Sequence, residues 1–396
     1  MLLLRRPKRG PARVGTGAAC AVLAVTLIAP AATAVAAPTV TATRLPVPAG
    51  ATSSEVSDIN NAGVAVGSAE VDGVSRALRW PSTGYTELPG TPDHPAAGAS
   101  RITDAGQVVG SASSADLTSR VILRWQPDGS CGVSGAFPLG VADLNERGDA
   151  LVTAVAGPRR FTAVVCHPDG SSTPTGLQSG YGIGADGRVA GAFSGTVENG
   201  FNHVPAVVSA DGTATRLPVP AGQAGVAYDV GPLGAVVGAL GTTSLSTGVP
   251  VFVPRVAVIW VGGRTVELGT LGGTTSRPAD TGRAVSRTGD VIGTSTTATG
   301  ETHAFLWRAG RMIDLGTLGG TSSTPTAVND RGQVVGYSTT RSGAQHAFLW
   351  SGGRMVDLGA PGGNTSLARD VNNAGQVVGS VTTPGGQRHA VRWTVR

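Results

Sequence analysis

The chain has 396 residues, among them 60 Gly and 25 Pro, and only 14% are charged. Its 30 basic residues outnumber its 25 acidic ones, but five basic and no acidic residues lie in the first 36 positions. The rest of the chain carries 25 of each sign (30 − 5 = 25), which excludes an electrostatic case for nucleic acid or an anionic membrane. The only lysine, Lys8, lies in the same segment, so the rest cannot form a Schiff base.

Residues 1–36 have the pattern of a secretory signal peptide. A basic start with Arg5 and Arg6 precedes an apolar run over 18–28, and Ala34-Val35-Ala36 forms a cleavage site. We predict export to the extracellular space, with the Sec or twin-arginine route and retention at the cell surface left open. The apolar run is too short for a membrane span, so none is expected after cleavage.

One repeat unit occupies the rest of the chain, residues 37–396, as a single domain. All six tryptophans share its phase, with successive gaps of 45, 135, 47, 43 and 43 residues: Trp80, Trp125, Trp260, Trp307, Trp350 and Trp393. The long gap contains two units without Trp, at 163–166 and 206–209. A period in the low forties is typical of a four-stranded propeller blade.

Each unit reads as four short strands. A turn closed by Gly leads into an apolar strand with an internal Gly, as in 333–338. A longer loop, a strand such as 346–350, a second tight turn and a fourth strand follow. The β-branched residues and regular turn signals predict all-β structure, and the strand glycines indicate close backbone approach.

The order of strands predicts how the domain closes. The third strand of the unit occurs eight times, and its last copy, 389–393, nearly ends the chain. The nonapeptide 42–50 is identical to 214–222, where it forms a fourth strand and loop. We therefore predict an eight-bladed β-propeller whose N-terminal strand closes the last blade, which removes free sheet edges. A seven-bladed ring is the fallback, and an open solenoid is third.

Two cysteines remain after the signal peptide. Cys131 and Cys166 lie in neighbouring units of an exported protein, which favours a disulfide between them. Such a bridge would contribute roughly 3–4 kcal/mol in the chain-entropy model. The alternative is a pair of buried thiols.

The C-terminal units carry a recognisable signature. They contain His303-Ala304-Phe305-Leu306-Trp307, the run 314–320 (Asp-Leu-Gly-Thr-Leu-Gly-Gly) and His346-Ala347-Phe348-Leu349-Trp350. Over about residues 260–396 the chain resembles the HAF-repeat family of extracellular bacterial proteins, and the match fades toward the N-terminus. The resemblance implies a secreted or surface repeat protein and transfers no functional residue.

Three patterns resemble metal-binding, calcium-binding or nucleotide-binding motifs, and each is interpreted as part of the repeat structure. Equivalent positions of neighbouring blades, such as His303, His346 and His389, would lie too far apart for one metal ion, so no metal or cofactor is expected. The segments 58–63 and 370–375 lack the carboxylates of a calcium loop and are expected to form turns. Residues 182–187 match G-x-G-x-x-G without a following helix, which excludes a nucleotide site.

The loops predict where a ligand would bind. Loops between second and third strands, and those between units, share one face and vary in length, with insertions at 193–203 and 241–255. We predict binding residues on this face, with tolerated insertions as the alternative: His94, Phe201, His203, Phe252, Arg255, Arg277 and Arg341.

With no catalytic motif, the sequence favours a monomeric, non-enzymatic protein that binds an extracellular protein or glycan. One alternative is a polysaccharide-active hydrolase or lyase, which needs paired carboxylates roughly 5–10 Å apart in a cleft. Another is a purely structural surface protein. Two carboxylates converging in the axial channel would favour the enzyme.

Overall fold

The computed structural model describes residues 38–125, 130–131, 138–157, 160–197, 200–244, 251–280 and 283–396. The chain divides into two units, Met1–Ala37 and Pro38–Arg396. The first unit, which contains the predicted signal peptide, lies outside the described residues. Apart from strands, the regular structure described in the second unit is the 3-10 turn η1 (Pro232–Gly234). No helix in the described ranges is long and apolar enough to cross a membrane.

Most strands form four-stranded antiparallel sheets, as the repeat predicts, and two sets of four are joined into one eight-stranded sheet by a parallel contact between Thr302 and Ser322. The first strands of the sets are β2 (Ala51–Ile59), β6 (Ala96–Ile102), β10 (Pro138–Leu144), β14 (Ser179–Ile183), β18 (Ala224–Val230), β22 (Gly272–Pro278), β26 (Gly319–Val328) and β30 (Thr365–Val371). The second strands are β3 (Ala65–Val71), β7 (Val108–Ser113), β11 (Ala150–Gly157), β15 (Val189–Val197), β19 (Val236–Ser244), β23 (Val291–Thr297), β27 (Val334–Thr340) and β31 (Gln376–Thr382).

The remaining strands complete these sets. The third strands are β4 (Val74–Trp80), β8 (Arg120–Trp125), β12 (Arg160–Cys166), β16 (Gly200–Val208), β20 (Val251–Val261), β24 (Thr302–Arg308), β28 (Gln345–Ser351) and β32 (Arg388–Val395). The fourth strands are β5 (Thr86–Leu88), β9 (Ser130–Cys131), β13 (Ser172–Pro174), β17 (Ala214–Arg216), β21 (Arg264–Gly269), β25 (Arg311–Asp314), β29 (Arg354–Gly359) and the N-terminal β1 (Val40–Arg44).

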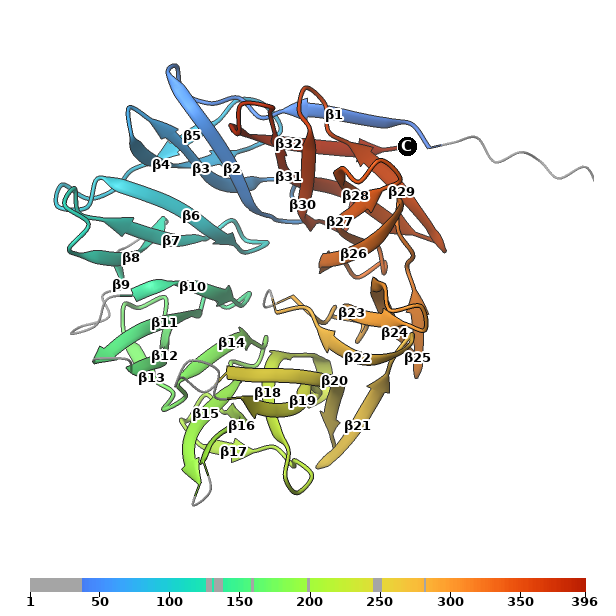
Figure 1. Cartoon of the computed structure of the whole chain (residues 1–396). Coiled ribbons are helices and arrows are strands. Elements are labelled where there is room, and N and C mark those ends of the chain that lie inside the picture. Colours follow the sequence, from blue (N-terminus) through green and yellow to red (C-terminus); the bar gives the residue numbers. More distant parts are fainter. Residues whose placement is uncertain are drawn as a thin grey trace, which may run out of the picture. The chain divides into compact units, whose positions relative to one another are not determined.

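The two ends of the described chain meet in one sheet. Strand β1 pairs antiparallel with β32 from Val40↔Val395 to Arg44↔Val391, so this sheet has the order β1-β32-β31-β30. Strand β2 packs against β30, β31 and β32, and Figure 1 shows the blue strand β2 beside these red strands. The N-terminal strand therefore occupies the fourth-strand position that the C-terminal set lacks.

The core lies between successive sheets rather than within one of them. One cluster joins Val237 and Ile259 of one set to Phe305 of the next and to Phe348 of the set after that, all buried. Side chains alternate along each strand, so both faces of a sheet are apolar where it is covered by its neighbours. Each set thus depends on the next one to bury its surface.

Three of the repeated tryptophans, Trp80, Trp125 and Trp260, donate an indole hydrogen bond to a proline carbonyl. The Trp80 indole donates to the carbonyl of Pro46 at 2.6 Å, and the Trp260 indole donates to Pro218 at 2.8 Å. Pro46 and Pro218 hold the same place in the two copies of the nonapeptide. In both places the duplicated segment therefore provides the proline carbonyl that accepts the indole hydrogen bond from the following set.

The strand glycines lie where backbones approach closely, as predicted. A Cβ at Gly336 would come within 2.0 Å of the Thr324 carbonyl oxygen on the adjacent first strand. The same contact measures 2.0 Å between Gly67 and Glu55. No side chain fits these positions without backbone movement.

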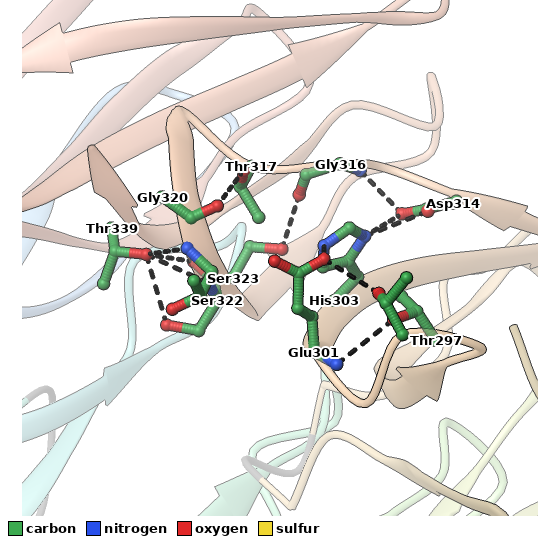
Figure 2. A network of polar contacts seen from close by, with 12 residues as sticks. Thr297, Glu301, His303, Asp314, Gly316, Thr317, Gly320, Ser322, Ser323 and Thr339 are labelled. Carbon is green, nitrogen blue, oxygen red and sulfur yellow. Dashed lines mark hydrogen bonds and ion pairs between the residues drawn. The ribbon is translucent and has the colours of Figure 1, made fainter. Parts of the chain in front are cut away.

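A serine near the start of several first strands links neighbouring sets. Its hydroxyl accepts the backbone N–H of an alanine on the preceding third strand, at 2.8 Å for Ser323 and Ala304 and 2.9 Å for Ser54 and Ala390. Ser323 also donates to the Gly316 carbonyl at 2.6 Å, as Figure 2 shows. The Gly-rich run 314–320 thus serves to connect sets.

Candidate functional site

A β-bulge interrupts most of the first strands near their ends. The pairing register shifts between Val56 and Asp58 and, on the last set, between Ala368 and Asp370. The residues skipped by these shifts are here called the bulge residues: Ser57, Ser100, Ala142, Tyr181, Tyr228, Thr326 and Arg369. Bulges re-aim side chains and are frequent beside active sites.

A buried aspartate follows the bulge in four sets. The four linking aspartates are Asp58, Asp143, Asp229 and Asp370. Each one accepts the backbone N–H of a residue in the next set: Ile102 at 2.8 Å, Ile183 at 2.9 Å, Val285 at 3.1 Å and Ile59 at 3.1 Å, respectively. These carboxylates therefore join neighbouring sets and occupy the centre of the unit.

Arg283 binds two of the linking aspartates at once. Its Nη2 lies 2.7 Å from Asp58 Oδ1, and its Nη1 lies 2.7 Å from Asp370 Oδ2. The Asp58 side chain is fully buried and that of Asp370 is 4% exposed, whereas one third of the Arg283 side chain remains exposed. The two carboxylates thus converge on one guanidinium, an arrangement that sequence alone did not locate.

The two carboxyl groups differ in their affinity for protons. Burial raises the pKa of Asp58 to about 7 against the opposing charge of Arg283. Burial also acts on Asp370, but Arg283 and the hydrogen bond from Asp58 hold the pKa of that carboxyl below its usual range. Asp58 is therefore the member of the pair that keeps its proton to higher pH, and Asp370 is the member that ionises first.

Asp370 and Arg283 line a pocket of about 280 Å³, here called the loop-side pocket. Its walls come from first-strand residues at and beside the bulges, together with Arg283. Four bulge residues contribute, and the lining includes Glu55, Ser57, Ser100, Arg101, Arg283, Thr326, Arg369 and Asp370. The pocket offers three guanidinium groups together with two carboxylates.

A second cavity of about 540 Å³ lies at the turns that join the first strands to the second strands, and it is here called the turn-side pocket. Arg283 lines both cavities. At the turn side, Arg287 Nη2 contacts Asp104 Oδ2 at 3.2 Å and Glu146 Oε1 at 2.9 Å. Arg287 therefore ties its own turn to the turns of two other sets.

The turns that resemble calcium loops have a structural task. Asn372 donates its side-chain N–H to the Asn60 carbonyl at 3.1 Å, and Asn60 donates likewise to the Thr103 carbonyl at 3.1 Å. These amides are engaged between sets. Within the described ranges no group of three His, Cys, Asp or Glu side chains could hold a metal ion.

Two of the three repeated histidines form separate pairs with aspartates. His303 Nδ1 lies 2.9 Å from Asp314, and His346 Nδ1 lies 2.9 Å from Asp357. Figure 2 shows His303 between Asp314 and Glu301. His389 instead lies near Arg44, and burial together with this charge lowers the pKa of His389. His303 and His346 thus each have an aspartate partner of their own.

The predicted loop-face residues occupy several places, and none lines the loop-side pocket. The His203 and Phe252 rings lie 5.8 Å apart, centroid to centroid, whereas His94 bonds Ser119 at 2.9 Å. Arg277 pairs with Asp280 at 3.3 Å and lines a third pocket. Arg255 and Arg341 are exposed. Phe201 belongs to β16, and its side chain lies outside the described part.

Cys166 is buried and disulfide-bonded. Its predicted partner, Cys131, belongs to β9, but the side chain of Cys131 lies outside the described part of the structure. The pairing of Cys131 with Cys166 remains a prediction.

Sequence reasoning missed the linking aspartates, although a signal for them exists. Asp58, Asp143, Asp229 and Asp370 all stand five positions before the turn glycine of their unit. That spacing could have identified these acids. It could not have identified Arg283 as their partner, because Arg283 reaches them from a different set.

Comparison with known proteins supports the fold. No family model and no curated protein matches the chain. Among solved structures, dipeptidyl peptidase 4 of Porphyromonas gingivalis aligns with a TM-score of 0.53 at 10% identity, over 86% of this chain and 58% of that one. Its likeness shows a propeller-like fold and no more.

Two further structures are less similar. A puromycin-hydrolysing peptidase of Mycobacterium tuberculosis aligns with a TM-score of 0.49 at 12% identity, over 87% of this chain and 62% of that one. A streptogramin B lyase aligns with a TM-score of 0.42 at 12% identity, over 90% of this chain and 98% of that one. The chain spans less than two thirds of the length of both peptidases.

One of these structures contradicts a prediction from the sequence. The chain was expected to be no enzyme because no catalytic motif was found, yet the dipeptidyl peptidase whose fold it shares is an enzyme. The absence of a local motif was an insufficient ground for that expectation, because catalytic groups can come from separate parts of a chain. The reaction of this chain cannot be taken from such distant likeness.

Proposed function

We propose that the protein is a polysaccharide-active hydrolase or lyase whose active site is the loop-side pocket. The observation that carries this proposal is the convergence of Asp58 and Asp370 on Arg283, with Asp370 at the pocket wall. Carboxyl pairs whose environments move their pKa values apart are suited to acid and base roles.

The residues have distinct roles in this proposal. Asp370, ionised and lining the pocket, accepts a proton in either reaction. In a hydrolase the proton comes from water, whose oxygen bonds to the anomeric carbon as the glycosidic C–O bond breaks. In a lyase it comes from a sugar carbon, and the electron pair left by the broken C–H bond forms a C=C bond as the C–O bond to the glycosidic oxygen breaks. Asp370 then returns the proton to the departing oxygen. Asp58 has no exposed surface and shares its proton with Asp370, so it acts as a positioning residue. Arg283 fixes the geometry of both carboxylates and presents its exposed part to the substrate.

A structural role of these acids competes with the catalytic one, since all four linking aspartates join sets. Asp370 differs from Asp229 in that Asp370 lines the loop-side pocket, whereas Asp229 lines the turn-side pocket. Asp229 also has no ion pair with Arg283 among the described residues. Asp229→Asn therefore provides a matched control for Asp370→Asn.

The test incubates the purified protein with a panel of polysaccharides and with the insoluble wall of the producing cell. Reducing ends report cleavage by either reaction, and an unsaturated sugar end reports a lyase alone. We expect the Asp370→Asn variant to cleave at least about 100-fold more slowly than the wild type, in the range of general acid–base catalysis. The Asp229→Asn variant should keep the wild-type rate. Equal losses in both variants, tracking their thermal unfolding, would show that the acids are only structural.

We also propose that the domain is an eight-bladed ring, secreted as a monomer and built of HAF repeats. The pairing of β1 with β32 and the bond from the Ile59 N–H to Asp370 support closure. The N-terminal sequence of the protein from culture medium tests export, and we expect it to begin at Ala37. An intact N-terminus on cytoplasmic protein would refute export.

A further inference from the structure

We infer that the loop-side pocket selects a sugar residue that bears a carboxylate, so that the substrate class is an acidic, uronate-containing glycan. This inference rests on the proposed function, because it places the recognised sugar in the same pocket. The juxtaposition of Arg369 with Arg283 and Arg101 around that pocket carries it.

Arg369 is the residue whose charge is uncompensated. It is the bulge residue of β30, its side chain is exposed, and it lines the pocket. Throughout the described ranges Arg369 makes no ion pair and no side-chain hydrogen bond. The bulge directs this side chain toward the pocket, and its guanidinium is available to donate to an incoming anion.

The other charges of the pocket are largely matched within the protein. Arg283 is bound by Asp58 and Asp370, and Glu55 is bound by Arg388. Arg101 donates to the Ala142 carbonyl at 2.9 Å and lies 4.0 Å from Asp143. The excess positive charge therefore lies at Arg369.

A planar guanidinium recognises a carboxylate through two parallel hydrogen bonds. The bulge residues Ser57 and Ser100 add hydroxyl groups to the same lining, which suit the hydroxyls of a sugar ring. The volume of about 280 Å³ lies just below the usual range for drug-sized ligands, which favours a single sugar residue in the pocket.

The experiment measures binding of galacturonic acid trisaccharide and of its neutral analogue, galactose trisaccharide, by calorimetry. We expect the acidic ligand to bind at least about tenfold more tightly, which corresponds to about 1.4 kcal/mol. Arg369→Gln should remove this preference, Arg369→Lys should restore part of it, and Arg354→Gln should leave it unchanged. Arg354 is exposed on β29 and does not line the pocket.

The outcomes separate this inference from the proposed function. Cleavage of neutral glycans with no preference for uronate would overturn the inference and leave the enzyme. Tight, Arg369-dependent binding without any cleavage would support the inference and overturn the enzyme. A sulfated trisaccharide bound as tightly as the uronate would overturn the carboxylate as the recognised group, and loss of preference in Arg354→Gln would overturn the role of Arg369.

Discussion

The indole N–H of Trp80 donates to the carbonyl of Pro46 at 2.6 Å, although Pro46 belongs to the segment after β1 and Trp80 ends β4. Pro46 follows the strand that pairs with β32 at the C-terminus. This hydrogen bond therefore ties the first complete set to the sheet that contains both ends of the described chain.

This bond predicts a difference between two tryptophans. Trp80 and Trp393 are both fully buried, but the Trp393 indole N–H has no hydrogen-bond partner within the described chain. Trp80→Phe should lower the free energy of unfolding by about 1 kcal/mol more than Trp393→Phe does, because only Trp80 loses a hydrogen bond. The lost ring volume is the same in both variants.

Denaturant unfolding of the two variants measures this difference. The prediction fails if Trp393→Phe is as destabilising as Trp80→Phe. Trp260→Phe provides a repeat of the test, since its indole donates to Pro218 in the second copy of the nonapeptide.

The strand glycines give a second prediction. Gly336→Ala would place its Cβ 2.0 Å from the Thr324 carbonyl oxygen, so the strands must separate. We expect a loss of about 1–3 kcal/mol or more in the free energy of unfolding, in the range of overpacked sites. Gly385→Ala is the control, because its Cβ would meet no atom closer than 3.8 Å. A thermal midpoint of Gly336→Ala equal to that of Gly385→Ala would contradict the close approach.

Several features of the fold could be predicted from the sequence because they recur with the period. The phase of the tryptophans located the third strands, and the turn glycines located the ends of the first strands. The duplicated nonapeptide pointed to the N-terminal strand as a fourth strand. Each of these signals needs only the chain's own repetition and the local chemistry of turns and strands.

The candidate site was not predicted, for a physical reason. A β-bulge changes which side chains of a strand share a face. The alternation of apolar and polar residues along the sequence does not show which residue the bulge skips. Arg369 and Ser57 reach the pocket in this way. Arg283 meets Asp58 and Asp370 only because three sets converge, and such convergence leaves no local pattern.

The disulfide supplies a third prediction. If Cys131 is the partner of the disulfide-bonded Cys166, then Cys131→Ser, Cys166→Ser and the double variant should have the same thermal midpoint. The expected loss is at most roughly 3–4 kcal/mol for the loop that the bond would close. Mass spectrometry of a non-reduced digest identifies the linked peptides. A double variant much less stable than either single variant would argue against this pairing.

The linking aspartates predict how stability depends on pH. Burial raises the pKa of Asp58 to about 7 and that of Asp229 to about 8, from an ordinary value of 3.8. At a pH between the ordinary pKa of 3.8 and the raised pKa, the folded chain keeps a proton that the unfolded chain has released. The free energy of unfolding should therefore fall as pH rises from about 4 to about 8. Asp370, whose pKa is lowered, has the opposite sign and loses its contribution below its ordinary value.

Urea unfolding at pH 5 and pH 8 measures this slope. Burial lowers the pKa of His203, which adds an opposing slope near 6.5, so variants must be compared rather than the wild type alone. Asp58→Asn should flatten the decline between pH 5 and pH 8, and Asp229→Asn should do so independently, because an amide cannot titrate. A decline that survives in the double variant would mean that other groups cause it, and that the proton held between Asp58 and Asp370 is not linked to folding.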